Sequence, residues 1–129
     1  MLQANAAEGI YRVEDAYVNC TAGSADELDV PGRPRVVFTP GHTHGHCSLH
    51  FPDRGTVIAG DAVVLLNPYT GRRGPQIVAG AATADSKRAL ASLDALAATG
   101  AETVLTGHGE PWIGGVEEAV QRARAAGAS

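Results

Sequence analysis

Three short apolar segments of this chain share one pattern: each ends in a glycine-bearing turn, and a residue able to bind a metal follows directly. They are RVVFTPG before His42, TVIAG before Asp61 and TVLTG before His108. β-Branched runs of this length predict buried strands, and glycine lets the backbone turn sharply where a strand ends. Side chains just beyond the ends of core strands can converge on one edge of a sheet and be held there rigidly. Two histidines and an aspartate form a reasonable ligand set for zinc with an open position.

The second half of the sequence alternates such strands with helices. ADSKRALASLDALAATG, residues 84–100, places Leu90, Leu93 and Ala97 on one face with Leu96 beside them, which predicts an amphipathic helix. Its expected ends are Thr83 or Asp85 as the N-terminal cap and Gly100 as the stop. A final amphipathic helix is expected over Val116 to Ala126. This alternation argues for a layered α/β fold.

The remaining elements are less sharply marked. CSLHF, residues 47–51, places Cys47, Leu49 and Phe51 in alternation with polar residues, which predicts a strand half-buried on the side of those three. NPYTGRRGPQ, residues 67–76, is rich in turn formers and predicts a loop. Near the start of the chain, GIYRV and AYVNC indicate weak β-structure.

Length and charge limit the classes of function. A chain of 129 residues with 44% apolar residues is long enough for one domain with a core, which we expect to span residues 1–129. The net charge is −4, and no basic stripe occurs beyond Arg72-Arg73, which disfavours nucleic acid as a partner. The two arginines are expected to be solvated, with contact to an anionic substrate as the alternative.

The cysteines and the first residues bear on location. Cys20 and Cys47 are not in a C-x-x-C pair; a disulfide between them is an open alternative. The opening MLQANAAEGIYRVED lacks the pattern of a signal peptide, and no apolar run approaches membrane-spanning length. We therefore expect a cytoplasmic, reduced protein with no membrane partner.

Residues 39–51, TPGHTHGHCSLHF, hold four of the five histidines. The alternation of His42, His44 and His46 fits either a three-pronged chelate or one ligand with two companions. Residues two apart point the same way only in an extended segment, and Gly41 and Gly45 argue against a regular strand. His44 and His46 as replacement ligands remain an alternative.

In order, TPGHTHGH, IAGD and LTGHG resemble the later half of the metallo-β-lactamase superfamily domain, over roughly residues 25–115. The resemblance implies half of an αββα sandwich, with a mixed sheet and helices on one face. It also implies a metal-dependent hydrolase of an ester, thioester or lactone-type bond in a small-molecule substrate. The implied metal is zinc, with iron or manganese as alternatives.

Carried over by position, the resemblance makes His42 a ligand of one metal, Asp61 a carboxylate bridging two metals and His108 a ligand of the second. The same three residues would form the catalytic site. In the family's GHTxGH motif the first histidine is the ligand and the second lies behind it. Three residues are therefore expected to support the ligands without binding metal: Thr43, His44 and His46.

One family motif, H-x-H-x-D-H, is absent from all 129 residues. In the family it lies upstream and supplies four ligands, one of which is the aspartate that handles the proton of water. The alternative hypothesis is therefore a non-catalytic module, active only with a partner if at all, either a natural half-protein or a truncated product. The faces left exposed on a half-domain predict a homo-oligomer, or association with a missing N-terminal half.

Overall fold

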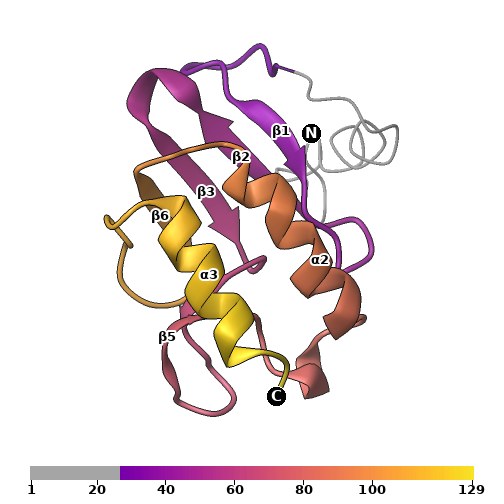
Figure 1. Ribbon diagram of the computed structural model, residues 1–129. Coiled ribbons are helices and arrows are strands. Elements are labelled where there is room, and N and C mark those ends of the chain that lie inside the picture. The colour runs from indigo at the N-terminus through magenta and orange to yellow at the C-terminus, as the bar shows by residue number, and fades with distance from the viewer. Residues whose placement is uncertain (1–26) are drawn as a thin grey trace.

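The computed structural model describes residues 27–129, so the expected strands at GIYRV and AYVNC lie outside the described residues. The elements, labelled in Figure 1 where there is room, are β1 (Arg35–Phe38), β2 (Cys47–Phe51), the 3₁₀ helix η1 (Pro52–Arg54), β3 (Thr56–Gly60), β4 (Val64–Leu66), β5 (Arg73–Gln76), the 3₁₀ helix η2 (Gly80–Ala82), α2 (Ser86–Ala97), β6 (Thr103–Thr106) and α3 (Val116–Ala126).

A four-stranded mixed sheet carries the fold, in the order β1-β2-β3-β6. β1 pairs antiparallel with β2, and β2 with β3, whereas β3 and β6 run parallel. β4 and β5 form a separate two-stranded antiparallel sheet. The expected α/β class with a mixed sheet is confirmed. The parallel pair also places the ends of β3 and β6, which precede Asp61 and His108, at the same edge of the sheet.

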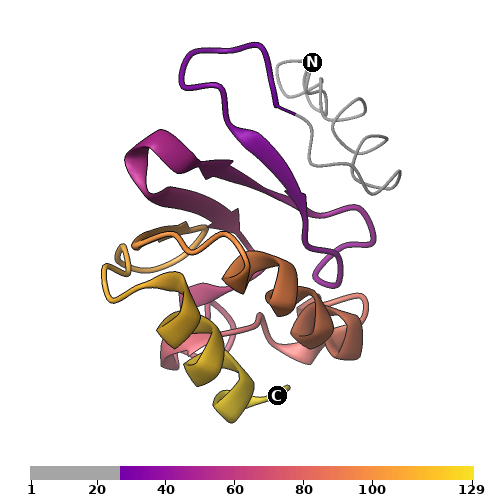
Figure 2. The ribbon, with the colours of Figure 1, turned by 45° about the horizontal axis from the view of Figure 1, so that its top comes forward.

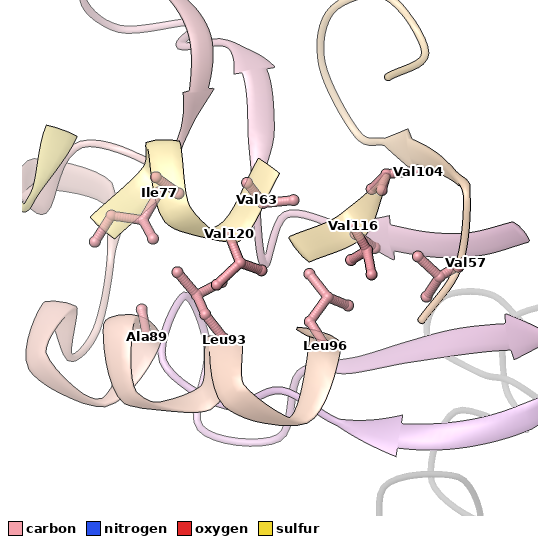
Figure 3. Packing of buried hydrophobic residues seen from close by; sticks show 12 residues of the cluster. Val57, Val63, Ile77, Ala89, Leu93, Leu96, Val104, Val116 and Val120 are labelled. Carbon is pink, nitrogen blue, oxygen red and sulfur yellow. The ribbon is translucent and has the colours of Figure 1, made fainter. Parts of the chain in front are cut away.

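Helices α2 and α3 lie on one side of the sheet (Figures 1 and 2), and the core fills the space between them and the strands. Figure 3 shows Leu93 and Leu96 of α2 pointing toward Val120 and Val116 of α3. Leu93 and Leu96 are fully buried. Burial of a leucine side chain contributes about 1.5–3 kcal/mol, so this layer supports the strand ends that carry the site.

The two predicted helices form where the sequence placed them. The carboxylate of Asp85 caps α2 by accepting a hydrogen bond from the backbone N–H of Arg88 at 2.9 Å. This satisfies one of the N–H groups that have no partner inside the first turn. After α2 the chain turns at Gly100, whose φ is +65°. The final helix has the predicted bounds, Val116–Ala126.

The burial pattern of β2 differs from the prediction. The fully buried residue is Ser48, whereas Cys47, Leu49 and Phe51 are half-buried. Ser48 can face the core because its hydroxyl has partners there: it contacts the hydroxyl of Thr39 at 2.9 Å and donates to the carbonyl of Ala59 at 3.3 Å. A buried polar group with hydrogen-bond partners avoids most of the cost of leaving water.

The prediction of an uninterrupted loop over residues 67–76 is wrong, since β5 occupies its last four residues. Side chains build this hairpin as much as the turn does. The Gln76 amide donates to the carbonyls of Arg72 at 2.7 Å and Gly74 at 2.9 Å, and the Asn67 amide donates to Gln76 at 3.4 Å. Turn-forming residues therefore mark only the tip, and two buried amides hold the strand that follows.

Two further observations concern the helices and Cys47. Within residues 27–129, none of the helices combines the length and apolar character needed to cross a bilayer. Cys47 is disulfide-bonded, so the expectation of a reduced thiol is wrong for this residue.

Candidate metal centre

His42 lies in the loop between β1 and β2, which is tied to the segment before α2. The backbone carbonyls of Gly41 and His42 accept from the N–H groups of Asp85 at 2.9 Å and Ala84 at 3.1 Å. Gly41 has a φ of +145°, and a Cβ there would lie 2.2 Å from the Cα of Ala89. No other residue fits this contact, so the glycine before His42 fixes the loop against the helix.

Asp61 follows β3 through a turn at Gly60, whose φ of +57° favours glycine. The backbone N–H of Asp61 donates to Nε2 of His46 at 3.1 Å. Gly107, at the end of β6, donates its N–H to the carbonyl of Gly60 at 2.8 Å. A Cβ on Gly107 would lie only 2.2 Å from Oδ1 of Asp61. The carboxylate therefore rests over a glycine that leaves room for it.

His108 follows β6 directly and is anchored through its own carbonyl oxygen. This oxygen accepts from the backbone N–H of Leu65 at 2.9 Å and of Leu66 at 3.2 Å, and from the hydroxyl of Thr106 at 2.8 Å. The backbone of His108 is thus held between β6 and β4, while 42% of its side chain is exposed. The imidazole is the most accessible member of the cluster.

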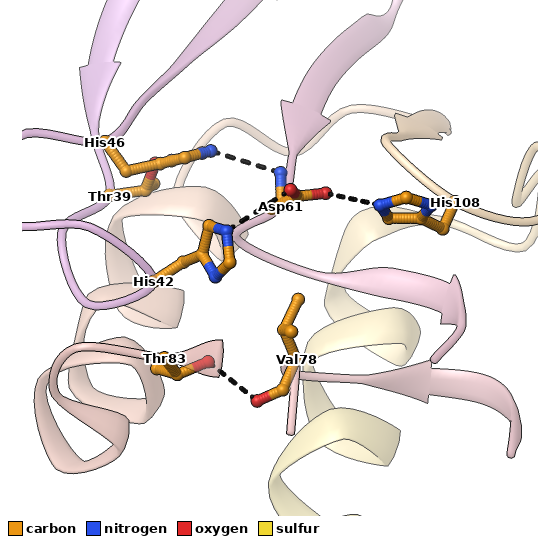
Figure 4. A network of polar contacts seen from close by, with 7 residues as sticks. All are labelled: Thr39, His42, His46, Asp61, Val78, Thr83 and His108. Atoms are coloured by element: carbon orange, nitrogen blue, oxygen red, sulfur yellow. Dashed lines mark hydrogen bonds and ion pairs between the residues drawn. The ribbon is translucent and has the colours of Figure 1, made fainter. Parts of the chain in front are cut away.

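The structure brings together the three residues that the strand-end pattern predicted. Nε2 of His42 lies 3.3 Å from Oδ2 of Asp61, and Nε2 of His108 lies 3.6 Å from Oδ1. Figure 4 shows the two imidazoles approaching the carboxylate from different sides. Each histidine thus addresses a different oxygen of the same aspartate.

These contacts are longer than good hydrogen bonds, which span about 2.7–3.2 Å for N–H···O. Within the described part of the chain, two buried atoms of the cluster have no hydrogen-bond partner: Oδ1 of Asp61 and Nδ1 of His42. Leaving a buried polar atom unpaired costs about 1–3 kcal/mol. Oδ1 of Asp61 is thus an electron-pair donor that the described part of the protein does not satisfy.

The two Nε2–Oδ distances can also be compared with the separation of ligand atoms around a metal ion. In a tetrahedral shell with bonds of about 2.0–2.2 Å, neighbouring donor atoms lie about 3.3–3.6 Å apart. The two distances in the cluster match this separation. Within residues 27–129, however, no group of three His, Cys, Asp or Glu side chains is arranged so that it could hold one ion. The donors are spaced as ligands but form two pairs around Asp61.

The three residues expected to support the ligands are placed differently from one another. Thr43 and His44 are exposed, although the carbonyl of Thr43 accepts from the N–H of Gly41 at 2.9 Å. His46 points inward, with Nδ1 lying 2.9 Å from the hydroxyl of Thr39 and Nε2 accepting from Asp61. Both ring nitrogens of His46 therefore have partners inside the protein, which leaves neither free to replace a missing ligand.

Electrostatics agree with a neutral His46. Burial lowers its pKa below the usual 6.5. The charge of Asp61 opposes this decrease, the charge of His42 adds to it, and a backbone hydrogen bond with Thr39 opposes it. A neutral imidazole can accept a hydrogen bond, as Nε2 does here.

Sequence reasoning missed three residues of this neighbourhood: Thr39, Ser48 and Gly107. Gly107 was recognised as part of a turn, but its contact with the Asp61 carboxylate depends on the parallel pairing of β3 and β6. Thr39 and Ser48 could have been noticed as polar residues on either side of the histidine loop, in segments that otherwise predict buried strands. Their hydrogen bonds become visible only with the register of β1 and β2.

A family model described as the metallo-beta-lactamase superfamily matches residues 8–108, which begins further upstream than the motifs suggested. The chain is 37% identical over 87 residues to the probable metallo-hydrolase YflN of Bacillus subtilis, covering 60% of this chain and 32% of that protein. It is 52% identical over 31 residues to a hydroxyacylglutathione hydrolase of Gloeobacter violaceus, covering 24% of this chain and 12% of that protein.

Solved structures of metallo-beta-lactamase family proteins are also similar to this chain. A metallo-beta-lactamase family protein of Thermus thermophilus superposes with a TM-score of 0.59 at 34% identity, covering 80% of this chain and 33% of that chain. The protein TTHA1623, in a di-iron-bound form, superposes with a TM-score of 0.54 at 31% identity, covering 72% of this chain and 43% of that chain. The chain thus spans about a third of the length of the first relatives it matches.

Proposed function

Because this chain belongs to the metallo-beta-lactamase superfamily, we propose that it is a metal-dependent hydrolase and that His42, Asp61 and His108 are its metal ligands. Zinc is the metal that nitrogen and carboxylate donors favour, with iron or manganese as alternatives. The bond cleaved would be an ester, thioester or lactone-type bond in a small molecule.

One observation carries the proposal: an aspartate whose two oxygens each face the Nε2 atom of a different histidine, at 3.3 and 3.6 Å. The residues fit a metal because these separations suit adjacent ligands better than hydrogen bonds. The unpaired Oδ1 of Asp61 is a donor of the kind that a cation would satisfy. In this arrangement Asp61 would bridge two sites, with His42 at one and His108 at the other.

A metal bound there would polarise a carbonyl oxygen and lower the pKa of a bound water toward neutrality. The chain's own residues would supply position and access. The loop contacts of Gly41 hold His42 against α2, and Gly107 leaves the space in which the Asp61 carboxylate rests. His108, the most exposed of the three, would lie on the side from which a small substrate arrives.

The relatives bear on the substrate class. A related hydrolase acts on hydroxyacylglutathione, as its name states, which favours a thioester among the three bond types. The partners we propose are this small-molecule substrate and either a second copy of the chain or a separate first-half segment. Of the two, only a separate first-half segment would supply the ligands of the H-x-H-x-D-H motif, because every copy of this chain lacks that motif. Nucleic acid and membrane partners are not proposed.

The test is metal content per chain, measured by elemental analysis of protein purified without chelators or a histidine tag. The variants are Asp61→Asn and His108→Ala, and the control is His44→Ala, which removes an exposed histidine from outside the cluster. We expect wild-type protein and the His44 control to retain metal, and the other two variants to lose it. Equal metal content in all four proteins would refute the ligand assignment.

Activity is tested separately on a panel of esters, thioesters and lactones. We expect turnover to follow metal content across the four proteins. A protein that holds metal at Asp61 yet cleaves none of the three bond types would refute the hydrolase assignment and leave the metal site standing.

A second candidate function is a non-catalytic module of the same fold. The observation that favours it is that no three-ligand group within the described residues is ready to hold one ion. It predicts no metal even after zinc is added back, and no turnover by the isolated chain.

A further inference from the structure

His46 stands apart from the other histidines because both of its ring nitrogens are engaged inside the protein. Figure 4 shows Nε2 reaching the backbone nitrogen of Asp61, and the distance is 3.1 Å. On the other side of the ring, Nδ1 lies 2.9 Å from the hydroxyl of Thr39. The ring thus connects the residue that carries the carboxylate with a hydroxyl at the end of β1.

The backbone N–H of Asp61 determines which nitrogen carries the proton. An amide N–H can only donate, so Nε2 must be the acceptor and must lack a hydrogen. A neutral imidazole then carries its hydrogen on Nδ1, which donates to the hydroxyl oxygen of Thr39. This contact therefore has one direction, although the heavy-atom positions alone would allow two.

The same order of donor and acceptor extends through the hydroxyls of Thr39 and Ser48. The Thr39 oxygen receives a hydrogen from His46, so its own hydrogen is available for the hydroxyl of Ser48 at 2.9 Å. The Ser48 hydroxyl in turn donates to the carbonyl of Ala59 in β3 at 3.3 Å. Thr39 and Ser48 are each only 1% exposed, so water does not compete for these hydrogens. In a buried chain of this kind, each hydrogen bond polarises the next.

We propose that Thr39 and Ser48 are positioning residues of the site, because their hydroxyls hold His46 with its hydrogen on Nδ1 and so keep Nε2 as a permanent acceptor for the backbone N–H of Asp61. These hydrogen bonds form a relay in which each group donates to the next: the Asp61 N–H, His46, Thr39, Ser48 and the Ala59 carbonyl. The effect of the relay on metal binding rests on the proposed function, whereas the positions of its hydrogens do not depend on that function.

The relay acts on the turn that aims the carboxylate. Gly60 has a φ of +57°, and a Cβ on it would lie 2.9 Å from Nε2 of His46. The ring therefore packs directly against the turn between β3 and Asp61. With His46 packed against the turn, the carboxylate keeps the orientation in which its oxygens face His42 and His108. Groups that orient a ligand in this way typically change metal affinity about 10- to 100-fold when removed.

The first arm of the test needs no metal and no variant. Two-dimensional ¹H–¹⁵N spectra of the imidazole nitrogens in metal-free protein report which nitrogen carries the hydrogen. We expect His46 to show a protonated Nδ1 and an unprotonated Nε2. A hydrogen on Nε2, or equal mixing of the two forms, would overturn the proposal.

The second arm removes the hydroxyl without changing the shape. Thr39→Val should mix the two forms of His46 and speed hydrogen exchange at the Asp61 amide, whereas Thr39→Ser should restore both to the wild-type state. Ser48→Ala should give a weaker effect of the same kind, and it is the fallback if Thr39→Val does not fold. The control is Thr83→Val, because the Thr83 hydroxyl donates to the carbonyl of Val78 and not to the relay.

The third arm measures zinc affinity by competition with a coloured chelator. Thr39→Val should weaken affinity about 10- to 100-fold, with Thr39→Ser and Thr83→Val close to wild type. If the wild-type chain binds no metal, the proposed function fails, and the spectra and amide exchange still decide the relay. A Thr39→Val protein with unchanged spectra, exchange and affinity would show that the hydroxyl chain only fills the core.

Discussion

The contact between Gly107 and Asp61 makes Gly107→Ala an informative perturbation. Gly107 is exposed and its φ does not lie in the left-handed region, so the backbone itself accepts alanine. The new methyl group would lie 2.2 Å from Oδ1 of Asp61, whereas real Cβ contacts stay beyond 3.0 Å. The carboxylate must therefore move by about 0.8 Å, the difference of these two distances.

Such a shift is large for a metal ligand, since ligand distances tolerate about 0.2 Å. Misplacing a group that sets ligand geometry typically costs about 10- to 100-fold in affinity. We expect Gly107→Ala to weaken zinc binding by this factor, which is about 1.4–2.8 kcal/mol. The melting temperature of the metal-free protein should change little, because Gly107 is exposed and the group that has to move is the Asp61 carboxylate.

The assay is a competition titration with a coloured zinc chelator, run beside a thermal melt of the metal-free protein. The matched control is Gly114→Ala, whose new Cβ would meet only the ring of Trp112 at 3.1 Å among its nearest atoms. The control should keep the wild-type affinity. An unchanged zinc affinity in a folded Gly107→Ala protein would refute the view that Asp61 binds metal in the position seen here.

Three further predictions concern the fold. Leu93→Ala should destabilise the protein by about 2–5 kcal/mol in urea denaturation, because Leu93 is fully buried between the helices; a cost below about 1 kcal/mol would contradict the packing. Asp85→Ala should cost about 1 kcal/mol through loss of the α2 cap, with Asp85→Asn nearly neutral in the same assay. Burial, and then the charge of Arg35, lower the pKa of His50 below 6.5. As the pH falls through 6.5, His50 takes up a proton in the unfolded chain before it does so in the folded protein, so the free energy of unfolding decreases. Arg35→Gln should lessen this decrease, and an NMR titration of His50 that is unchanged in Arg35→Gln would contradict the prediction.

Much of the fold could be predicted from short-range signals. The apolar runs that end in glycine became β1, β3 and β6, and the amphipathic patterns became α2 and α3. The meeting of His42, Asp61 and His108 was also predictable, because β1, β3 and β6 run in the same direction and the residues that follow them lie at one edge of the sheet. This prediction needs only the directions of the strands and no detail of the side chains.

Other features depended on pairing that the sequence does not display. Ser48 is buried because the register of β1 and β2 places it beside Thr39, so alternation of apolar residues selected the wrong side of β2. The strand β5 was missed because Gln76 secures it through carbonyls within the turn. Ser48 thus depends on a partner across the histidine loop, and Gln76 on carbonyls of its own hairpin.

The parallel pairing of β3 with β6 has a consequence for how the protein must be handled. Asp61 and His108 become neighbours only when two strands separated by β4, β5 and α2 have joined, and closing such a long loop is slow. His42, His44 and His46 lie in a local hairpin loop and are accessible in the unfolded chain. Zinc present during refolding would therefore meet those histidines first and stabilise unfolded states. Refolding should proceed under chelation, with metal supplied after the last strand has docked.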